Sequence, residues 1–135
     1  MLTHIPVGQT GSAEIVVAET HTAPFVGSGR VHVLATPVMI NLMEAAALAC
    51  VEALLPEGHQ SLGIKLDVSH TAATPVGMRV TATARVVAVE GRRVVFAVDA
   101  RDEKETVGEG VHERVVVNVS RFDERLAEKV AMIRR

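Results

Sequence analysis

The stretch "TPVMINLMEAAALAC", residues 36–50, constrains this chain more than any other because it is almost wholly apolar. Its first two residues predict a helix start, with Thr36 as the N-cap and Pro37 as the first helical residue. The helix should run to about Leu55, where a proline and a glycine follow within three residues. Because the helix is apolar nearly all round, we expect it to be buried rather than to lie on a surface.

One acid, Glu44, lies near the middle of this helix. Burying an unpaired carboxylate costs free energy, so Glu44 either accepts hydrogen bonds that compensate for its burial or takes part in chemistry. The other polar residue in the helix is Asn41, for which a hydrogen bond across a dimer is the simplest role. The two residues interrupt the apolar run, which argues against a membrane span.

The composition predicts one globular domain, residues 1–135, with 48% hydrophobic residues and only 2% aromatic ones. A net charge of -2 gives no electrostatic reason to expect nucleic acid or an anionic membrane as a partner. The one cysteine, Cys50, excludes an internal disulfide and fits the reducing cytoplasm. The N-terminus lacks a basic start followed by a long apolar stretch, so no signal peptide is expected.

The rest of the chain favours strands. Residues 13–19 predict a short strand, and residues 20–35 predict a loop or lid. After the helix, "SLGIKLDVSH" alternates, which predicts a half-buried strand with one face made of Leu62, Ile64, Leu66, Val68 and His70. Three further β-prone runs separated by short polar turns predict an antiparallel meander, and a terminal helix follows; these segments are 78–90, 93–101, 107–120 and 121–133.

This order predicts an α+β protein in which one antiparallel sheet is covered by one long helix, since such a sheet needs one face covered. A sheet wrapped around a single central helix is the hot-dog fold. One helix and one curved sheet leave an apolar flank or a free sheet edge, so we expect a homodimer.

Two polar residues become candidate partners of Glu44 in this arrangement. The alternation turns His70 towards the helix, where an imidazole can orient or protonate reacting groups, although a structural role remains open. Thr36 lies beside the free N–H groups of a helix N-terminus, which stabilise a developing oxyanion. Thr36 and Glu44 are eight residues apart, or about 12 Å along one helix. If both serve one site, two chains should share it.

Two further positions have alternative interpretations. Gly63 interrupts a strand, which indicates either a bulge or the close approach of a ligand. Arg114 lies in a β-prone run beside His112, where it can pair with an acid or bind an anion. The remaining histidines show no metal-ligand spacing, so we expect no metal site. The sequence contains no nucleophile elbow, phosphate-binding loop or dinucleotide fingerprint.

Two segments, "SLGIKLDVSHTAATPVGMRVTATARVVAVEGRRVVFAV" and "GEGVHERVVVNVSRF", resemble the fluoroacetyl-CoA-type thioesterases of the hot-dog superfamily. The combination of "HTAATP", "VEGRR" and "HER" carries the resemblance, and the helical "LME" fits it. The resemblance covers about residues 13–125. It implies hydrolysis of small acyl-CoA thioesters, with coenzyme A as part of the substrate and with no bound cofactor or metal.

The resemblance also assigns residues to a site at the interface of a homodimer. Thr36, Glu44 and His70 occupy the catalytic positions, and Gly63 and Arg114 occupy positions that contact substrate. The role of Glu44 as general base or as nucleophile stays open. Further pairing into a dimer of dimers is also left open.

One departure from the family pattern limits the expected substrate. The fluoroacetate-specialised member carries aromatic lid residues shortly before its catalytic threonine, whereas "GSGRVHVLA" here has none and Phe25 lies further upstream. We therefore expect a general acyl-CoA thioesterase, with an acyl carrier protein thioester as another substrate class. Two alternatives remain: a hot-dog enoyl-CoA hydratase and a non-catalytic acyl-CoA sensor.

Overall fold

The computed structural model describes residues 4–133. Residues 1–3 and 134–135, at the two ends of the predicted domain 1–135, lie outside the described residues. Two long helices, three short helical turns and five strands follow one another in the order β1 (Thr10–Val16), η1 (Glu19–His21), α1 (Ala23–Val26), α2 (Thr36–Val51), η2 (Glu52–Leu54), β2 (His59–His70), β3 (Arg79–Glu90), β4 (Arg93–Arg101), β5 (Thr106–Asn118) and α3 (Val119–Ile133).

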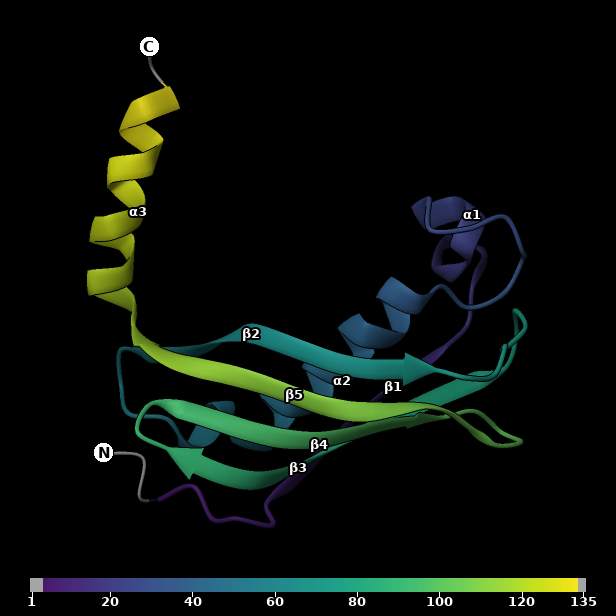
Figure 1. Ribbon diagram of the computed structural model, residues 1–135, viewed down its shortest axis with the longest axis horizontal. Coiled ribbons are helices and arrows are strands. Elements are labelled where there is room, and N and C mark those ends of the chain that lie inside the picture. The colour runs from purple at the N-terminus through teal and green to yellow at the C-terminus, as the bar shows by residue number, and fades with distance from the viewer. Residues whose placement is uncertain (1–3, 134–135) are drawn as a thin grey trace.

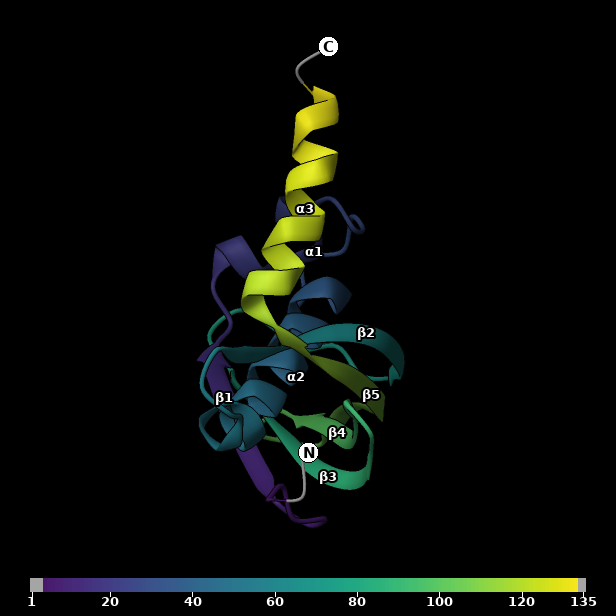
Figure 2. The ribbon, with the colours of Figure 1, turned by 90° about the vertical axis from the view of Figure 1, so that its left-hand side faces the viewer.

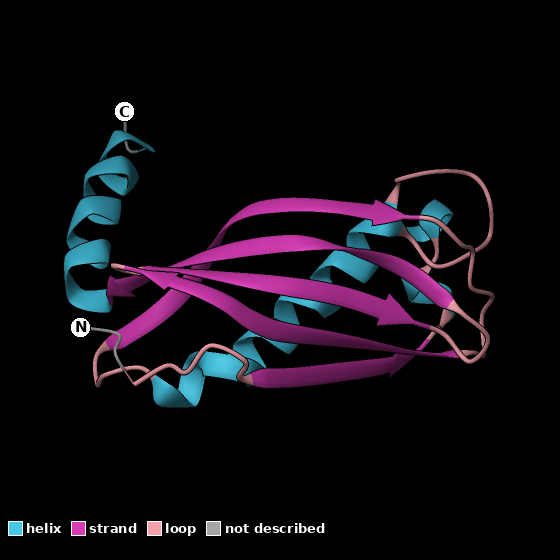
Figure 3. Ribbon diagram, turned by 60° about the horizontal axis from the view of Figure 1, so that its bottom comes forward, coloured by secondary structure: helices cyan, strands magenta, loops and turns pink. Residues whose placement is uncertain are grey.

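The five strands form one antiparallel sheet in the order β1-β3-β4-β5-β2, with β1 and β2 at its edges. The sheet curls around α2, which crosses its concave face (Figures 1, 2 and 3). This arrangement is the predicted hot-dog architecture. The last three strands lie within about two residues of their predicted ranges.

The predicted first strand, residues 13–19, was displaced, because β1 begins at Thr10 and ends at Val16. The strand extends back through Gly11, where α2 crosses very close. A Cβ on Gly11 would collide with the backbone of Ala46 and Cys50, so a glycine is required at this crossing.

Helix α2 supplies the apolar core. Its buried side chains include Met39, Met43 and Val51, and they pack mainly on β1 and β3. The predicted extension to about residue 55 is made by the short turn η2. The helix leaves much of the concave surface near β2 uncovered, since α2 has few contacts with that strand.

Two predictions for α2 were wrong in detail. The N-cap is Ala35 and not Thr36, which is the first helical residue and makes no capping hydrogen bond. Burial is also not complete within one chain, because Asn41, Leu48 and Ala49 on one side are exposed.

Strand β2 departs from the predicted alternation because of a β-bulge between Gly63 and Lys65. Before the bulge, Gly63 lies opposite the buried Arg114 and so faces the concave side. After it, Leu66 lies opposite the buried His112 on that same side. The extra residue therefore places Leu62 on the outer face, whereas Leu66, Val68 and His70 face inward as predicted.

Two segments extend beyond the sheet. Residues 20–35, here called the lid segment, contain α1 and the last two residues of η1, and they lie next to the start of α2. Helix α3 continues from β5 and stands away from the body (Figures 1 and 2), and none of its described residues is buried.

Candidate active site

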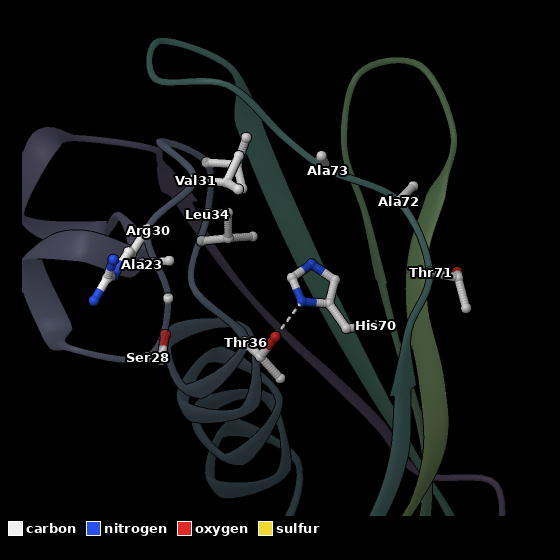
Figure 4. A pocket seen from close by; sticks show the side chains of 12 residues that line it. Ala23, Ser28, Arg30, Val31, Leu34, Thr36, His70, Thr71, Ala72 and Ala73 are labelled. Atoms are coloured by element: carbon white, nitrogen blue, oxygen red, sulfur yellow. Dashed lines mark hydrogen bonds between the residues drawn. The ribbon is translucent and has the colours of Figure 1, made fainter.

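Thr36 and His70 meet at one end of α2. The Thr36 hydroxyl Oγ1 lies 2.7 Å from Nδ1 of His70, a normal hydrogen-bond distance. They line a hollow of about 370 Å³ between the lid segment and the loop that follows β2. Figure 4 shows the two side chains pointing toward each other, with Val31 and Leu34 on the lid side and Ala72 and Ala73 nearby.

The surroundings of His70 favour its neutral form. Burial lowers the pKa of His70 below its usual value of 6.5, because the charged imidazolium is poorly solvated there. Its other ring nitrogen, Nε2, is buried and has no hydrogen-bond partner among residues 4–133. An imidazole with one nitrogen on a hydroxyl and the other unsatisfied is suited to exchange a proton with a bound molecule.

Glu44 lies in a second cluster, further along α2. Its Oε2 is 3.5 Å from Nη1 of Arg114 and 4.0 Å from Nε2 of His112. Gly63 abuts the same carboxylate, so that a Cβ at this position would clash with Oε2 of Glu44. The glycine predicted to mark either a bulge or a ligand's approach does border a bulge, and it also makes room for Glu44.

Arg114 is buried and holds this cluster together. Its Nε donates to Oγ of Ser61 at 2.8 Å and its Nη2 donates to the Ser61 carbonyl at 3.1 Å. Nη1 lies 3.1 Å from Nε2 of His112. Because the Ser61 hydroxyl and N–H both donate to the carboxylate of Glu52, at 2.8 and 2.7 Å, the guanidinium is fixed between two acids.

His112 belongs to this cluster and was not predicted from the sequence as a site residue. Its ring is fully buried and stacks on Phe96 with 5.9 Å between centroids. Nδ1 lies 2.9 Å from the carbonyl oxygen of Lys65 and must donate to it, which leaves Nε2 to accept from Arg114. Burial and the Arg114 charge lower the pKa of His112. The signal was a histidine two residues before Arg114, on the same inward face of one strand.

One chain therefore brings together Thr36 with His70, and Glu44 with Gly63 and Arg114, but not the two groups. The predicted pairing of Glu44 with His70 is absent within residues 4–133, where the polar contacts of Glu44 are Arg114 and His112. No group of three or more His, Cys, Asp or Glu side chains in this range is placed to hold a metal ion.

Comparison with known proteins identifies the family. The family model described as "Fluoroacetyl-CoA-specific thioesterase" matches residues 17–120. The chain belongs to this family. A fluoroacetyl-CoA thioesterase from Streptantibioticus cattleyicolor is 42% identical over 97 residues, which are 72% of this chain and 70% of the relative.

Two solved structures share the fold closely. That of the fluoroacetyl-CoA thioesterase FlK superposes with a TM-score of 0.87 and 35% identity, covering 92% of this chain and 96% of FlK. A thioesterase superfamily member from Thermus thermophilus, TTHA0967, has a TM-score of 0.86 and 33% identity, covering 95% and 97%. The resemblance, the hot-dog fold and the expectation of a thioester hydrolase acting on acyl-CoA are thereby confirmed.

Proposed function

We propose that this protein hydrolyses small acyl-CoA thioesters to the free acid and coenzyme A, at two identical sites that lie in the interface of a homodimer. The observation that carries this is the Thr36–His70 pair, which lines a hollow with one imidazole nitrogen unsatisfied. Water is the second substrate, and no bound cofactor or metal is required. The enzyme works in the cytoplasm without nucleic acid or membrane as a partner.

A dimer is supported by the exposed edge of the sheet. Strand β2 is a 12-residue edge strand on which Leu62, Ile64 and Leu66 are 39%, 54% and 37% exposed. A long apolar edge is a template for pairing with another strand. Pairing of two β2 strands would also cover the concave surface that α2 leaves open.

The segment Thr36–Leu54 is apolar and long enough to cross a membrane, but the buried face of α2 packs on the sheet instead.

The same pairing unites the two half-sites. An antiparallel β2–β2 pair has a two-fold axis. With this axis near Asp67, and with the bulge residue Ile64 left unpaired, Gly63 of one chain would lie opposite His70 of the other. Glu44, which abuts Gly63, then reaches the Thr36–His70 pair of the other chain. A shared site also removes the difficulty that Thr36 and Glu44 lie far apart on one helix.

The chemistry follows from these positions. The hydroxyl and the backbone N–H of Thr36, at the start of α2, hold the thioester carbonyl oxygen as charge develops on it. Glu44 from the other chain either takes a proton from the attacking water or attacks the carbonyl carbon itself. The neutral imidazole of His70 accepts the proton that the water gives up and delivers it to the departing thiolate, so that one water is consumed and one acid and one thiol are released.

Arg114 acts in this proposal through Glu44. Arg114 is 5% exposed, and its guanidinium is already bonded to Ser61, which does not suit binding the phosphates of coenzyme A. Instead, its positive charge attracts the Glu44 carboxylate and holds it in place. Gly63 remains the residue whose missing side chain leaves space between Glu44 and an acyl group.

The hollow favours a small aliphatic acyl group. Its apolar lining includes Val31, Leu34 and Ala72, and no aromatic side chain lines it. Phe25 is 65% exposed and lies outside the lining. Without an aromatic lid, a preference for the fluoroacetyl group has no support in this chain, so we propose a general small acyl-CoA substrate.

The test is thiol release from acyl-CoA substrates from acetyl to decanoyl, together with fluoroacetyl-CoA and phenylacetyl-CoA. Wild type and Glu44→Gln are compared, with solution mass as a control for folding and assembly. We expect turnover of short acyl chains by wild type and a loss of at least about 100-fold in the variant. Equal rates in both proteins would refute the role of Glu44. Binding of acyl-CoA without turnover by wild type would favour a sensor.

A further inference from the structure

Helix α3 presents an apolar stripe that is exposed beyond the half-buried Phe122 in the described part of the chain. The stripe consists of residues at helical spacing on one side, Phe122, Leu126, Val130 and Ile133. Leu126, Val130 and Ile133 are 47%, 45% and 78% exposed. A hollow of about 490 Å³ follows this side of the helix, lined by Leu126 and Val130 with Asp123 at its start. A helix with such a face gains its stability from tertiary packing, so it requires a partner.

The lid segment presents a second apolar surface of similar kind. Phe25, Val26 and Val31 are 65%, 41% and 70% exposed. Arg30, beside them, lines the hollow of Thr36 and His70 and makes no ion pair among residues 4–133. The lid segment therefore offers apolar side chains together with one unpaired cation, and α3 offers apolar side chains flanked by an acid.

The positions of the two surfaces relate them through the proposed dimer. Asn118, the residue before α3, lies opposite His59 at the start of β2, whereas the hollow under the lid segment begins at His70, the end of β2. Figure 1 shows α3 and α1 at opposite ends of the sheet, and both project past the β2 edge. A two-fold axis through the middle of β2 exchanges its ends, so α3 of one chain is carried to the lid segment of the other.

We propose that α3 packs its apolar stripe on the partner's lid segment and thereby closes the acyl-CoA site of the partner chain. The occupant of each stripe is thus a second copy of this protein, and Asp123 is placed to pair with the partner's Arg30. Each site then contains residues from two chains at its reacting centre and at its lid. This inference rests on the proposed dimer through β2 and goes beyond it.

Cross-linking tests the contact directly. A variant carrying Leu126→Cys and Phe25→Cys should form a disulfide between chains under mild oxidation, which non-reducing electrophoresis detects. The matched control carries Glu124→Cys and Phe25→Cys, with the new thiol on the opposite side of α3, and should not cross-link. The native Cys50 is buried. A cross-link in both variants, or in neither, would overturn the contact.

Kinetics test its consequence. Leu126→Glu and Val130→Glu should each raise KM for the best acyl-CoA substrate by roughly three- to tenfold, because the lid loses its apolar cover. Arg121→Gln makes the same change in net charge as either variant, on the far side of α3, and should leave KM unchanged. Equal KM values in all four proteins would exclude a role for α3 in closing the site.

A separate measurement distinguishes failure of this contact from failure of the dimer. Asp67→Cys places a thiol near the proposed two-fold axis, where it should cross-link two β2 strands, and solution mass reports the dimer directly. If Asp67→Cys cross-links the dimer but the Leu126→Cys and Phe25→Cys variant does not, the proposed function stands and the role of α3 is wrong. A fully active monomer rejects both.

Discussion

The two halves of the candidate site lie on the same helix and are built differently. The half with Thr36 and His70 is sparse: one hydrogen bond joins the two side chains, and one imidazole nitrogen is left unsatisfied beside a hollow. The half with Glu44 is crowded, because Arg114, His112 and their partners fill the space behind the carboxylate.

This difference indicates that the two halves have different roles. A buried polar atom without a hydrogen bond costs free energy. In the sparse half this atom lies at the hollow, where a bound substrate can supply the missing hydrogen bond. The crowded half satisfies its buried groups in advance, which holds one carboxylate in place before any substrate binds. A site assembled from both halves would combine an open pocket with a rigid base, and it needs two chains.

Mixing two inactive variants provides the largest expected effect. His70→Ala and Glu44→Gln homodimers should each lose at least about 100-fold in kcat/KM. If each site takes one half from each chain, a heterodimer contains one site with both defects and one with neither. After equal mixing and exchange of subunits, half of the dimers are mixed, so activity should return to about a quarter of the wild-type value.

The control for this experiment is a mixture of Glu44→Gln with Thr36→Ala-His70→Ala. Because the second protein carries both defects in the same half, mixing should restore the same fraction. Absence of any recovery in either mixture, with subunit exchange shown by mass spectrometry, would mean that each chain contains a complete site.

The geometry of Arg114 predicts the next largest effect. Arg114→Lys keeps the positive charge but loses the planar guanidinium group, whose several N–H donors reach Ser61 and His112 at the same time. We expect a fall of about tenfold to 100-fold in kcat, with KM changed less, because Glu44 loses its alignment. Arg93→Lys is the matched control on the outer face, where Arg93 bridges Glu90 and Glu113. Equal losses in both variants would indicate a general effect of the substitution.

Much of the fold could be predicted from the sequence because local patterns determine it. The helix from residue 36 and three of the strands follow from apolar periodicity and turn residues. The bulge after Gly63 could not be predicted, since it depends on the register of β2 against β5. The alternation of Leu62 with Leu66 looked continuous although the two residues lie on opposite faces.

The site was predictable in part for the same reason. Thr36 and His70 were expected near one helix and do meet, but the cap expected of Thr36 is absent because its hydroxyl bonds His70 instead. The network behind Glu44 combines side chains from η2, β2 and β5, which are distant in sequence. His112 and Glu52 therefore carried no local signal of their connection to it.

Gly63→Ala should have a moderate effect that identifies the crowded half as the sensitive one. The added methyl group would meet Oε2 of Glu44 and the ring of His112, so we expect a loss of roughly tenfold in kcat. Adding Glu44→Asp shortens the carboxylate and relieves the clash, so the double variant should be more active than the product of the two single effects predicts. Strict additivity would show that the two residues do not touch in the working enzyme.

The smallest expected effect separates the two halves by pH. The pKa of His112 is lowered by burial and by Arg114, and the pKa of His70 is lowered by burial. In the unfolded chain both titrate near 6.5, so below that pH the unfolded state binds more protons than the folded state. The free energy of unfolding should therefore fall as the pH decreases below 6.5 and should be fully retained above it.

Activity should show a different dependence in the same range. Protonation of His70 removes the neutral imidazole, so kcat/KM should fall on the acid side with a midpoint below 6.5. In His112→Asn, urea unfolding at several pH values should show a weaker loss of stability, whereas the acid midpoint of kcat/KM should stay in place because it belongs to His70. A shift of that midpoint in His112→Asn would mean that the two halves titrate together and that the division between them is not real.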